Sequence, residues 1–252
     1  ENPHANGSVH TGTGVTCPYP ATGAYRSVRV RCESWKWNPC HDGVMDRGRK
    51  TNVRKDHPVD VILASDNPNK FSEFLRLFSG SVVRMQLPAD AGSGVEAEEC
   101  GDSFLENARI KAVAYARAFC SWSLADDSGL EVDVLGGKPG VQSARFAGAR
   151  ASDEDRNAKL LRLLEGVPQA QRSARFQCAI AIAAPDASVV FTVLRECVGQ
   201  IGTGVHGCGG FGYDPLFIVG TGRLTMAEMS SDEKDRVGHR GQAARVAREF
   251  LE

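Results

Sequence analysis

The sequence predicts an α/β protein with a mixed central sheet, preceded by a disordered leader. Helical and strand patterns are interspersed from Val59 onward, which is typical of a sheet covered by helices. Two long β-rich runs joined at Pro185 and Asp186 predict a hairpin, so the sheet is expected to be mixed rather than purely parallel. The first 57 residues contain no Leu, Ile or Phe and cannot build an ordinary core. We expect residues 1–57 to be a disordered leader or an over-extended start, and residues 58–252 to form the folded domain.

Composition and charge exclude several classes of protein. With 42% apolar and 24% charged residues the chain is close to average globular usage, which excludes a disordered polyelectrolyte or a fibrous repeat. Its longest unbroken apolar run, residues 178–184, is far shorter than the roughly 20 residues of a membrane span. The formal net charge of -1 argues against a nucleic-acid coat built on bulk positive charge. We expect no membrane and no nucleic-acid partner, and an anionic ligand must meet locally placed cations.

The folded part is expected to begin with a strand, a turn and a helix. Residues 59–64 first alternate between apolar and polar and then become continuously apolar, which indicates a buried strand. The segment SDNPNK at 65–70 follows as a turn. Pro68 suits the first position of a helix. One apolar stripe of that helix is expected to face the core, and it consists of Phe71, Phe74, Leu75 and Phe78.

The remaining elements follow from caps, periodicity and turns. A second strand is expected at 82–87, and Ser103 with Glu106 forms a capping box for a helix reaching about Cys120. Another helix is expected at 152–164, followed by the hairpin strands at 174–183 and 188–198. The apolar run LFIV indicates a further strand, and a helix from about Arg240 closes the chain.

The eight cysteines show no spacing that predicts disulfides or a metal site. The five beyond residue 57 are scattered, as expected of a reduced cytosolic enzyme. Cys17, Cys32 and Cys40 lack the two-to-four-residue spacing of a zinc knuckle. Residues 1–57 also lack the apolar stretch of a secretory signal. We expect a cytoplasmic protein without disulfides.

The turn SDNPNK at 65–70 has the features of a phosphate-binding loop. A loop between a strand and a helix offers free backbone N–H groups and the positive end of the helix dipole, which stabilise a phosphate. Lys70 adds a full positive charge. Taken alone, the same residues are equally consistent with a simple helix cap, formed by Asn67 and Pro68 beside a solvated Lys70.

Two adjacent carboxylates, Asp126 and Asp127, are expected to end an apolar strand. Because side chains alternate along a strand, they should point to opposite sides and cannot both be core. Paired acids at a strand end could bind Mg²⁺, which takes oxygen ligands and holds substrate phosphates, and Glu98 or Glu99 could supply a second carboxylate. In isolation, acidic pairs are more often simply solvated.

A glycine-rich segment at 202–215 is expected to let the backbone approach a ligand closely. It contains G-x-G-x-x-G twice, which raises the alternative of a dinucleotide site. That motif should open a helix, whereas here the chain continues into an apparent strand, so we reject this reading as the primary one. Phe211 and Tyr213 indicate a platform for a flat base, and the alternative is a tight turn with two core aromatics.

The segment at 230–243 carries three basic residues, Lys234, His239 and Arg240. Lysine and arginine could hold phosphate or a base carbonyl there. Alone, the segment would be an ordinary polar helix junction. The sequence contains no Walker motif, no G-x-S-x-G and no H-E-x-x-H, which excludes the usual P-loop, α/β-hydrolase and zincin chemistries.

Taken together and in order, these segments resemble the inosine and xanthosine triphosphate pyrophosphatases, the Ham1-like family. The resemblance covers residues 59–252. It rests on SDNPNK, GDSFLENARIKA, ADDSGLEVDVLGGKPGVQSARFAG, GGFGYDPLF and MAEMSSDEKDRVGHRGQA. It implies a two-lobed mixed α/β fold with the active-site cleft between the lobes, a homodimer and Mg²⁺ dependence. The implied reaction is hydrolysis of purine nucleoside triphosphates (ITP, dITP and XTP) to the monophosphate and pyrophosphate.

The resemblance also implies roles for individual residues. The metal carboxylates would be Glu99 and Asp127, and Asp127 would also accept a proton from the attacking water. The phosphates would meet Lys111 and the first block, which consists of Ser65, Asp66, Asn67, Pro68, Asn69 and Lys70. The remaining substrate contacts would be Ser128, Phe211, Gly212, Tyr213, Asp214, Lys234, His239 and Arg240, with Phe211 as the stacking face.

Three positions depart from the family pattern: Asp66, Cys208 and Gly238. Of these, Asp66 places an extra negative charge beside a phosphate loop, which should lower affinity or favour a second metal ion. Two other functions stay open at this stage. One is a nucleotide-binding module that does not hydrolyse its ligand, and the other is a dinucleotide-dependent oxidoreductase built on the glycine segment.

Overall fold

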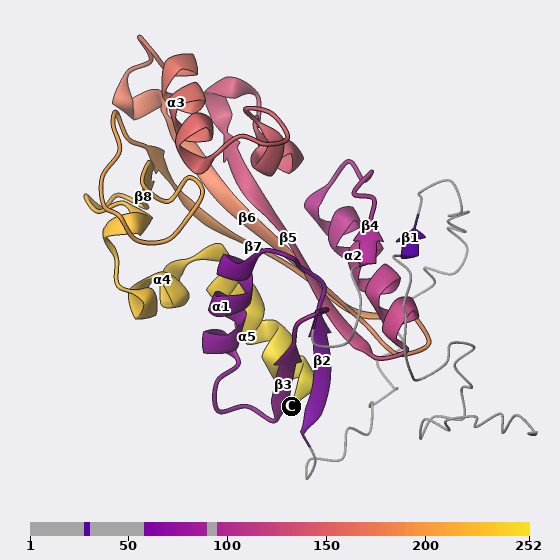
Figure 1. Ribbon diagram of the computed structural model, residues 1–252. Coiled ribbons are helices and arrows are strands. Elements are labelled where there is room, and N and C mark those ends of the chain that lie inside the picture. The colour runs from indigo at the N-terminus through magenta and orange to yellow at the C-terminus, as the bar shows by residue number, and fades with distance from the viewer. Residues whose placement is uncertain (1–27, 31–57, 90–94) are drawn as a thin grey trace, which may run out of the picture.

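The computed structural model describes residues 28–30, 58–89 and 95–252, and its helices and strands alternate along the chain (Figure 1). Its strands are β1 Val28–Val30, β2 Val59–Leu63, β3 Val83–Gln86, β4 Val95–Ala97, β5 Trp122–Val132, β6 Ser173–Ala183, β7 Val189–Ile201 and β8 Phe217–Val219. Its α-helices are α1 Pro68–Leu77, α2 Phe104–Phe119, α3 Asp153–Leu163, α4 Ser231–Val237 and α5 His239–Leu251. None of the helices in these ranges is long and apolar enough to cross a membrane.

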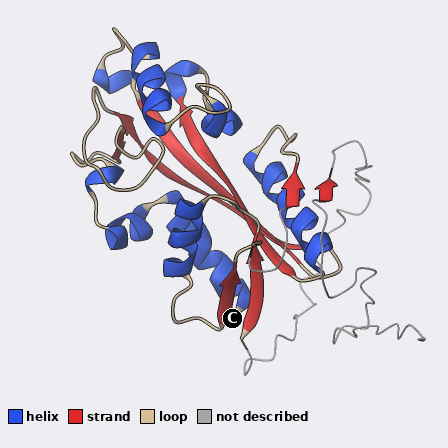
Figure 2. Cartoon of the chain, viewed as in Figure 1, coloured by secondary structure: helices blue, strands red, loops and turns tan. Residues whose placement is uncertain are grey.

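Six of the strands form one mixed sheet, in the order β3-β2-β5-β6-β7-β8 (Figure 2). Strand β2 is parallel to both β3 and β5, whereas β5, β6, β7 and β8 are successively antiparallel. Parallel neighbours need a crossover, which α1 supplies between β2 and β3, while the β6–β7 pair needs only a turn. The predicted α/β fold with a mixed sheet and a long hairpin is confirmed.

The helix starts follow from local capping, as predicted. The Asn67 side chain accepts hydrogen bonds from the N–H groups of Asn69 and Lys70, and Pro68 occupies the first turn of α1. Ser152 forms a complete capping box at the start of α3. At α2, Ser103 caps as expected, but the Glu106 carboxylate accepts from the N–H of Asp102 instead of Ser103.

Three hydrophobic clusters fix how the helices cover the sheet. On one face α1 and α5 pack against the strands through a cluster that includes Leu63, Phe74, Leu124, Ile180 and Ala247. On the other face α2 packs through small residues that include Ala108, Ala112, Ala125 and Ala179. The third cluster lies towards the opposite end of β5 and β6 and includes Leu130, Leu160, Phe176 and Phe217. Figure 1 shows α3 and β8 at that end, so the long strands connect two lobes.

The space between the lobes exists because β5 continues beyond its parallel partner. The pairing with β2 ends at Leu63 and Leu124, whereas β5 runs on to Val132 beside β6. After Leu63 the chain turns away and enters α1. The loop at 65–70 and the part of β5 after Leu124 therefore face a region that no strand of the parallel half fills.

The acidic pair departs from its predicted position. Asp126 and Asp127 lie within β5 rather than at its end, because the pairing with β6 continues through both of them to Val132. They alternate in direction as expected, but both are buried, at 0% and 7% exposure. The prediction that they cannot both be core is confirmed in that Asp127 lines a cavity whereas Asp126 does not, and each carboxylate pairs with a cation.

Several smaller predictions also differ from the structure. Leu75 was expected on the buried face of α1 but is 46% exposed. The side chain of Glu73 is buried on that helix instead. The short elements β4 and α4 were not predicted. Cys100 and Cys120, at opposite ends of α2, each take part in a disulfide, which contradicts the expectation of no disulfides. The predicted leader and its three cysteines lie outside the described residues, apart from Val28–Val30, which pair as β1 with β4.

Candidate active site

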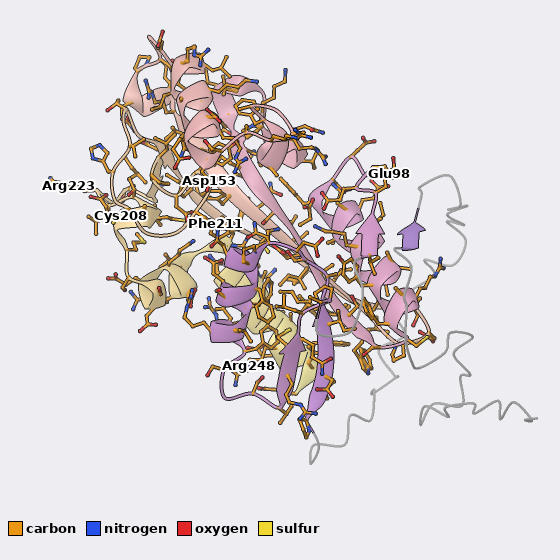
Figure 3. The ribbon with its side chains drawn as sticks, viewed as in Figure 1. Glu98, Asp153, Cys208, Phe211, Arg223 and Arg248 are labelled. Atoms are coloured by element: carbon orange, nitrogen blue, oxygen red, sulfur yellow. The ribbon has the colours of Figure 1, made fainter. Side chains whose placement is uncertain are left out.

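A cavity of about 700 Å³ lies between the two lobes, which is within the usual range for a small-molecule site. All of the residues that the family resemblance assigned to the site line it: Ser65, Asp66, Asn67, Pro68, Asn69, Lys70, Glu99, Lys111, Asp127, Ser128, Phe211, Gly212, Tyr213, Asp214, Lys234, His239 and Arg240. Asp126 and Glu98, the other two candidate carboxylates, do not line it. Segments far apart in the chain thus meet around one space. In Figure 3, Phe211 lies between Asp153 of the α3 lobe and helix α1.

The loop at 65–70 forms one wall and directs the start of α1 at the cavity. The Ser65 hydroxyl accepts from the N–H of Asn67 at 3.2 Å, and Asn67 in turn caps the helix. Lys70 Nζ lies 3.1 Å from Asp126 Oδ2. The loop therefore combines a helix N-terminus with an ammonium group, which is the arrangement that favours an anion.

Asp126 lies behind this wall and acts as a counterion. Its Oδ2 is 3.1 Å from Lys70 Nζ and 3.3 Å from Arg240 Nε, and it accepts from the Ser128 hydroxyl at 3.2 Å. Burial opposes the charge, but Lys70 and Arg240 outweigh it and hold the pKa of Asp126 well below its usual value. Asp126 does not line the cavity, so only Asp127 of the acidic pair faces the ligand space.

Asp127 and Glu99 meet at the ammonium group of Lys111. Lys111 Nζ lies 3.3 Å from Asp127 Oδ1 and 3.1 Å from Glu99 Oε1, and it donates to the Asp126 carbonyl at 2.7 Å. Asn107 donates to Asp127 Oδ2 at 3.2 Å and accepts from the N–H of Gly101 at 2.8 Å. Although burial opposes it, contact with the two carboxylates raises the pKa of Lys111 above its ordinary value. Burial raises the pKa of Asp127, and the Lys111 charge opposes that rise.

The donor set at this point fits a hard divalent cation. Among residues 58–89 and 95–252, no group of three or more His, Cys, Asp or Glu side chains is placed to hold a metal. Mg²⁺ needs no such cage, since it is usually held by one or two carboxylates together with water and substrate phosphates. Glu99 and Asp127 supply two carboxylates that already converge on one cation, the Lys111 ammonium.

Another part of the cavity wall is built on a network of buried charges that begins at α1. Lys234 Nζ lies 2.6 Å from both Glu73 Oε1 and Asp214 Oδ2, and Arg240 also pairs with Glu73. Lys234 and Arg240 both lie near the ring of Phe211, at 4.9 Å and 5.4 Å from its centroid. Asp214 additionally accepts from the N–H of Phe211 at 2.9 Å, so this network fixes the aromatic ring.

The two aromatic residues of the glycine segment have different environments. Tyr213 is 4% exposed and its hydroxyl donates to the Ser143 carbonyl at 2.9 Å, so it is mainly a core residue. Phe211 is half-buried and lines the cavity. The backbone of Gly212 is bound to α3, because its N–H donates to Asp153 and its carbonyl accepts from Asn157. Phe211 is therefore the aromatic face that a planar base could reach.

His239 is a buried, neutral ring at the first position of α5. It is 4% exposed and stacks on Phe176 with centroids 4.7 Å apart. Burial, together with the charges of Arg240 and Lys234, holds its pKa well below the ordinary 6.5. Within the described part of the chain its Nδ1 has no hydrogen-bond partner, although the ring lines the cavity. It can therefore serve as an uncharged polar contact to a ligand.

Several residues of the site were not found from the sequence. Glu73 and Asn107 hold the predicted residues from behind, through long-range contacts that no local pattern reveals. Arg145, Asp153 and Arg156 line the cavity from the α3 lobe. Among the three departures from the family pattern, Asp66 lines the cavity and is exposed, whereas Cys208 and Gly238 do not line it.

Comparison with known proteins identifies the family. The model of the Ham1 family matches residues 61–250, which is most of the chain. The chain belongs to the Ham1 family. This confirms the resemblance drawn from the five sequence blocks.

Similar proteins of the Ham1 family match over nearly their whole length. The dITP/XTP pyrophosphatase of Methylococcus capsulatus is 48% identical over 189 residues, covering 74% of this chain and 92% of that protein. The dITP/XTP pyrophosphatase of Bacillus subtilis is 42% identical over 193 residues, covering 77% and 97%. A solved HAM1 protein from Coxiella burnetii has a TM-score of 0.68 at 36% identity, covering 77% of this chain and 98% of that one.

Proposed function

We propose that this protein is a Mg²⁺-dependent pyrophosphatase that hydrolyses dITP, ITP and XTP to the monophosphate and pyrophosphate. The observation that carries the proposal is the convergence of Asp127 and Glu99 on Lys111, in a cavity that also receives Lys70 and the start of α1. Relatives that are 42–48% identical carry the name dITP/XTP pyrophosphatase, which supports the same substrate class. No observation favours a nucleotide-binding module without hydrolysis.

The balance of charge around the cavity supports a metal requirement. The cations lining it are Lys70, Lys111, Arg145, Arg156, Lys234 and Arg240. The carboxylates lining it or paired directly behind it are Asp66, Glu73, Glu99, Asp126, Asp127, Asp153 and Asp214. Since these seven acids outnumber the six bases, a triphosphate would find no excess of positive charge. A divalent cation bound with the substrate would supply it.

The residues of the site have different roles in phosphoryl transfer. Mg²⁺ held by Glu99 and Asp127 would neutralise charge on phosphate oxygens and favour ionisation of water. Asp127 orients the attacking water and accepts its proton, and the metal would reduce the basicity that this transfer requires. Lys70 binds the phosphates, and together with the positive end of the α1 dipole it stabilises the charge that shifts during the reaction. Lys111 keeps the two carboxylates in place.

Base selection follows from hydrogen-bond polarity at the Phe211 end. Hypoxanthine and xanthine present O6 as an acceptor, whereas adenine presents an amino donor. Arg240 is a permanent donor, and His239 is neutral with an unpaired Nδ1 among the described residues. In a complex with an adenine nucleotide, the amino group would face a buried donor, and neither could form a hydrogen bond. This would cost about 1 to 3 kcal/mol of binding free energy, or roughly ten- to a hundredfold discrimination against adenine.

We also propose a cytoplasmic homodimer. The outer part of β7 exposes three apolar side chains, Val189 at 38%, Leu194 at 45% and Val198 at 58%. Exposed apolar side chains along one strand offer a surface that a second copy of the chain could cover. Light scattering of the purified protein at micromolar concentration should give twice the chain mass, and a monomer would refute the assembly.

The reaction is tested by identifying the products. Incubation with dITP and Mg²⁺ should release pyrophosphate and the monophosphate, and release of orthophosphate instead would refute the reaction type. Chelation of Mg²⁺ with EDTA should stop turnover without unfolding the protein. Asp127→Asn should lower kcat by at least about a hundredfold, because the amide cannot accept the proton. The matched control is Asp133→Asn, since Asp133 follows the same strand, is 53% exposed and does not line the cavity.

A further inference from the structure

One cation of the cavity differs from the others in having no carboxylate partner. Lys70, Lys111, Arg156, Lys234 and Arg240 each form at least one ion pair. Arg145 also lines the cavity, yet in the described part of the chain it pairs with no acid. Its Nε donates to Gln142 Oε1 at 3.3 Å, and its two terminal nitrogens donate to no described residue. Its guanidinium charge is therefore available to a ligand.

The backbone that carries Arg145 is braced, although its side chain is exposed. Arg145 ends the 3₁₀ helix Gly140–Arg145. Within that helix the Ser143 hydroxyl donates to the Gly140 carbonyl at 2.6 Å and accepts from the N–H of Leu130 at 2.9 Å. The carbonyl of Ser143 accepts from Tyr213, and the next carbonyl accepts from Arg156. A side chain on such a support loses little entropy from the backbone when it binds.

This 3₁₀ helix packs beside strand β5, and Arg145 lines the cavity from its end. The helix packs directly on β5 at Gly129, where an added Cβ would lie 2.4 Å from Ser143 Oγ and 2.7 Å from the Gly140 carbonyl. Gly129 is two residues after Asp127. Arg145 belongs to the α3 lobe, whereas Lys70 belongs to the lobe that carries α1. The two cations thus border the same cavity from different lobes.

We propose that Arg145 is a further substrate-binding residue that contacts the phosphate chain from the lobe opposite Lys70. The inference rests on the proposed function, because it assumes a triphosphate in this cavity. A guanidinium group offers several N–H donors in a plane and matches phosphate oxygens well. The other lining cations already have carboxylate partners, so Arg145 adds a positive charge that pairs with no acid in the described part of the chain.

The test is steady-state kinetics of Arg145→Gln with dITP. Charge-assisted hydrogen bonds at a partly exposed site predict a KM about tenfold higher. The kcat should stay within about twofold, because the contact is made equally in the ground and transition states. Arg145→Lys should recover part of the affinity as a point charge. Arg150→Gln is the matched control, since Arg150 is exposed in the same segment and does not line the cavity.

Product inhibition separates a phosphate contact from other roles. The inhibition constant for pyrophosphate should rise about tenfold in Arg145→Gln, whereas that for the nucleoside monophosphate should change little. An unchanged KM and unchanged pyrophosphate inhibition would overturn the inference while leaving the proposed function intact. A shift in monophosphate inhibition alone would overturn the assignment of Arg145 to the part of the phosphate chain that leaves as pyrophosphate. If wild-type protein does not hydrolyse dITP, the proposed function fails, and this inference fails with it.

Discussion

Replacing Glu73 with glutamine is expected to weaken both the fold and the site. Glu73 is 7% exposed and lies between Lys234, at 2.6 Å, and Arg240. Removing one partner of a buried ion pair typically costs about 3 to 5 kcal/mol, since it leaves a buried charge without compensation. Here Lys234 keeps Asp214 and Arg240 keeps Asp126. We therefore expect a loss at or just below the lower end of that range, about 2 to 3 kcal/mol, or roughly 5 to 10 °C in Tm.

The pH dependence of this loss follows from the pKa of Glu73. Burial opposes its charge, but Arg240 and Lys234 outweigh it and lower the pKa from the ordinary 4.5. A carboxylate with a lowered folded-state pKa stabilises the protein above its unfolded pKa, and that contribution disappears as the pH falls through the folded value. The stability difference between wild type and Glu73→Gln should be complete at pH 7 and should shrink below about pH 4.5.

The measurement is urea unfolding of both proteins at pH 7 and pH 4. Glu249→Gln is the matched control, because Glu249 is an exposed glutamate on α5 and forms no ion pair among the described residues. If Glu73→Gln unfolds with the same free energy as Glu249→Gln at pH 7, Glu73 does not hold the two cations. The reasoning would also fail if the difference grew at acidic pH.

Two further predictions concern the glycine segment and His239. Gly210→Ala should destabilise the protein by more than 2 kcal/mol and raise KM, because φ is +69° and the new Cβ would lie 2.1 Å from Asp214 Oδ2. Gly80→Ala, at φ +73° with open space around it, should show only the backbone cost of about 1 kcal/mol. Because the pKa of His239 lies well below 6.5, His239→Asn should change the level of kcat/KM but not its pH dependence between pH 6 and 8. A wild-type step near pH 6.5 that the variant lacks would contradict this.

The helix starts could be predicted because their causes are local. Asn67 and Pro68 set the start of α1, and Ser152 sets that of α3, through bonds that reach only two or three residues. The hairpin and the closing helix were equally visible, since strand and helix periodicities are properties of short segments. The short elements β4 and α4 carried too few residues to show a period.

Long-range charge pairing could not be predicted from the sequence. Glu73 has the expected place of a polar residue on an amphipathic helix, yet it is buried by partners 161 and 167 residues further along the chain. The same holds for Asp126 in β5, whose buried carboxylate accepts a hydrogen bond from Arg240, 114 residues away. Rules based on neighbouring residues predict that such carboxylates stay in water. The cost of burying them is offset only by cations from distant segments, which reach them when the chain is folded.

The list of site residues owed more to the family resemblance than to physical reasoning. The blocks identified which loops face the cavity, and every carried-over position lines it. The pattern of blocks did not separate cavity-facing side chains from supporting ones. Tyr213 was expected as part of a base platform, whereas its ring is almost fully buried. Conversely, Arg145 lies inside one of the five sequence blocks, but nothing in the neighbouring sequence indicated that its charge pairs with no described acid.

The reactive carboxylate is mounted on regular structure rather than on a flexible connection. Asp127 belongs to a strand that stays in register with its neighbour for ten consecutive residue pairs, from Ser123 to Val132. The loops around the cavity can therefore be exchanged or lengthened by protein engineers without displacing that carboxylate. Grafting loops from other members of the family would be a practical way to redesign which bases this scaffold accepts.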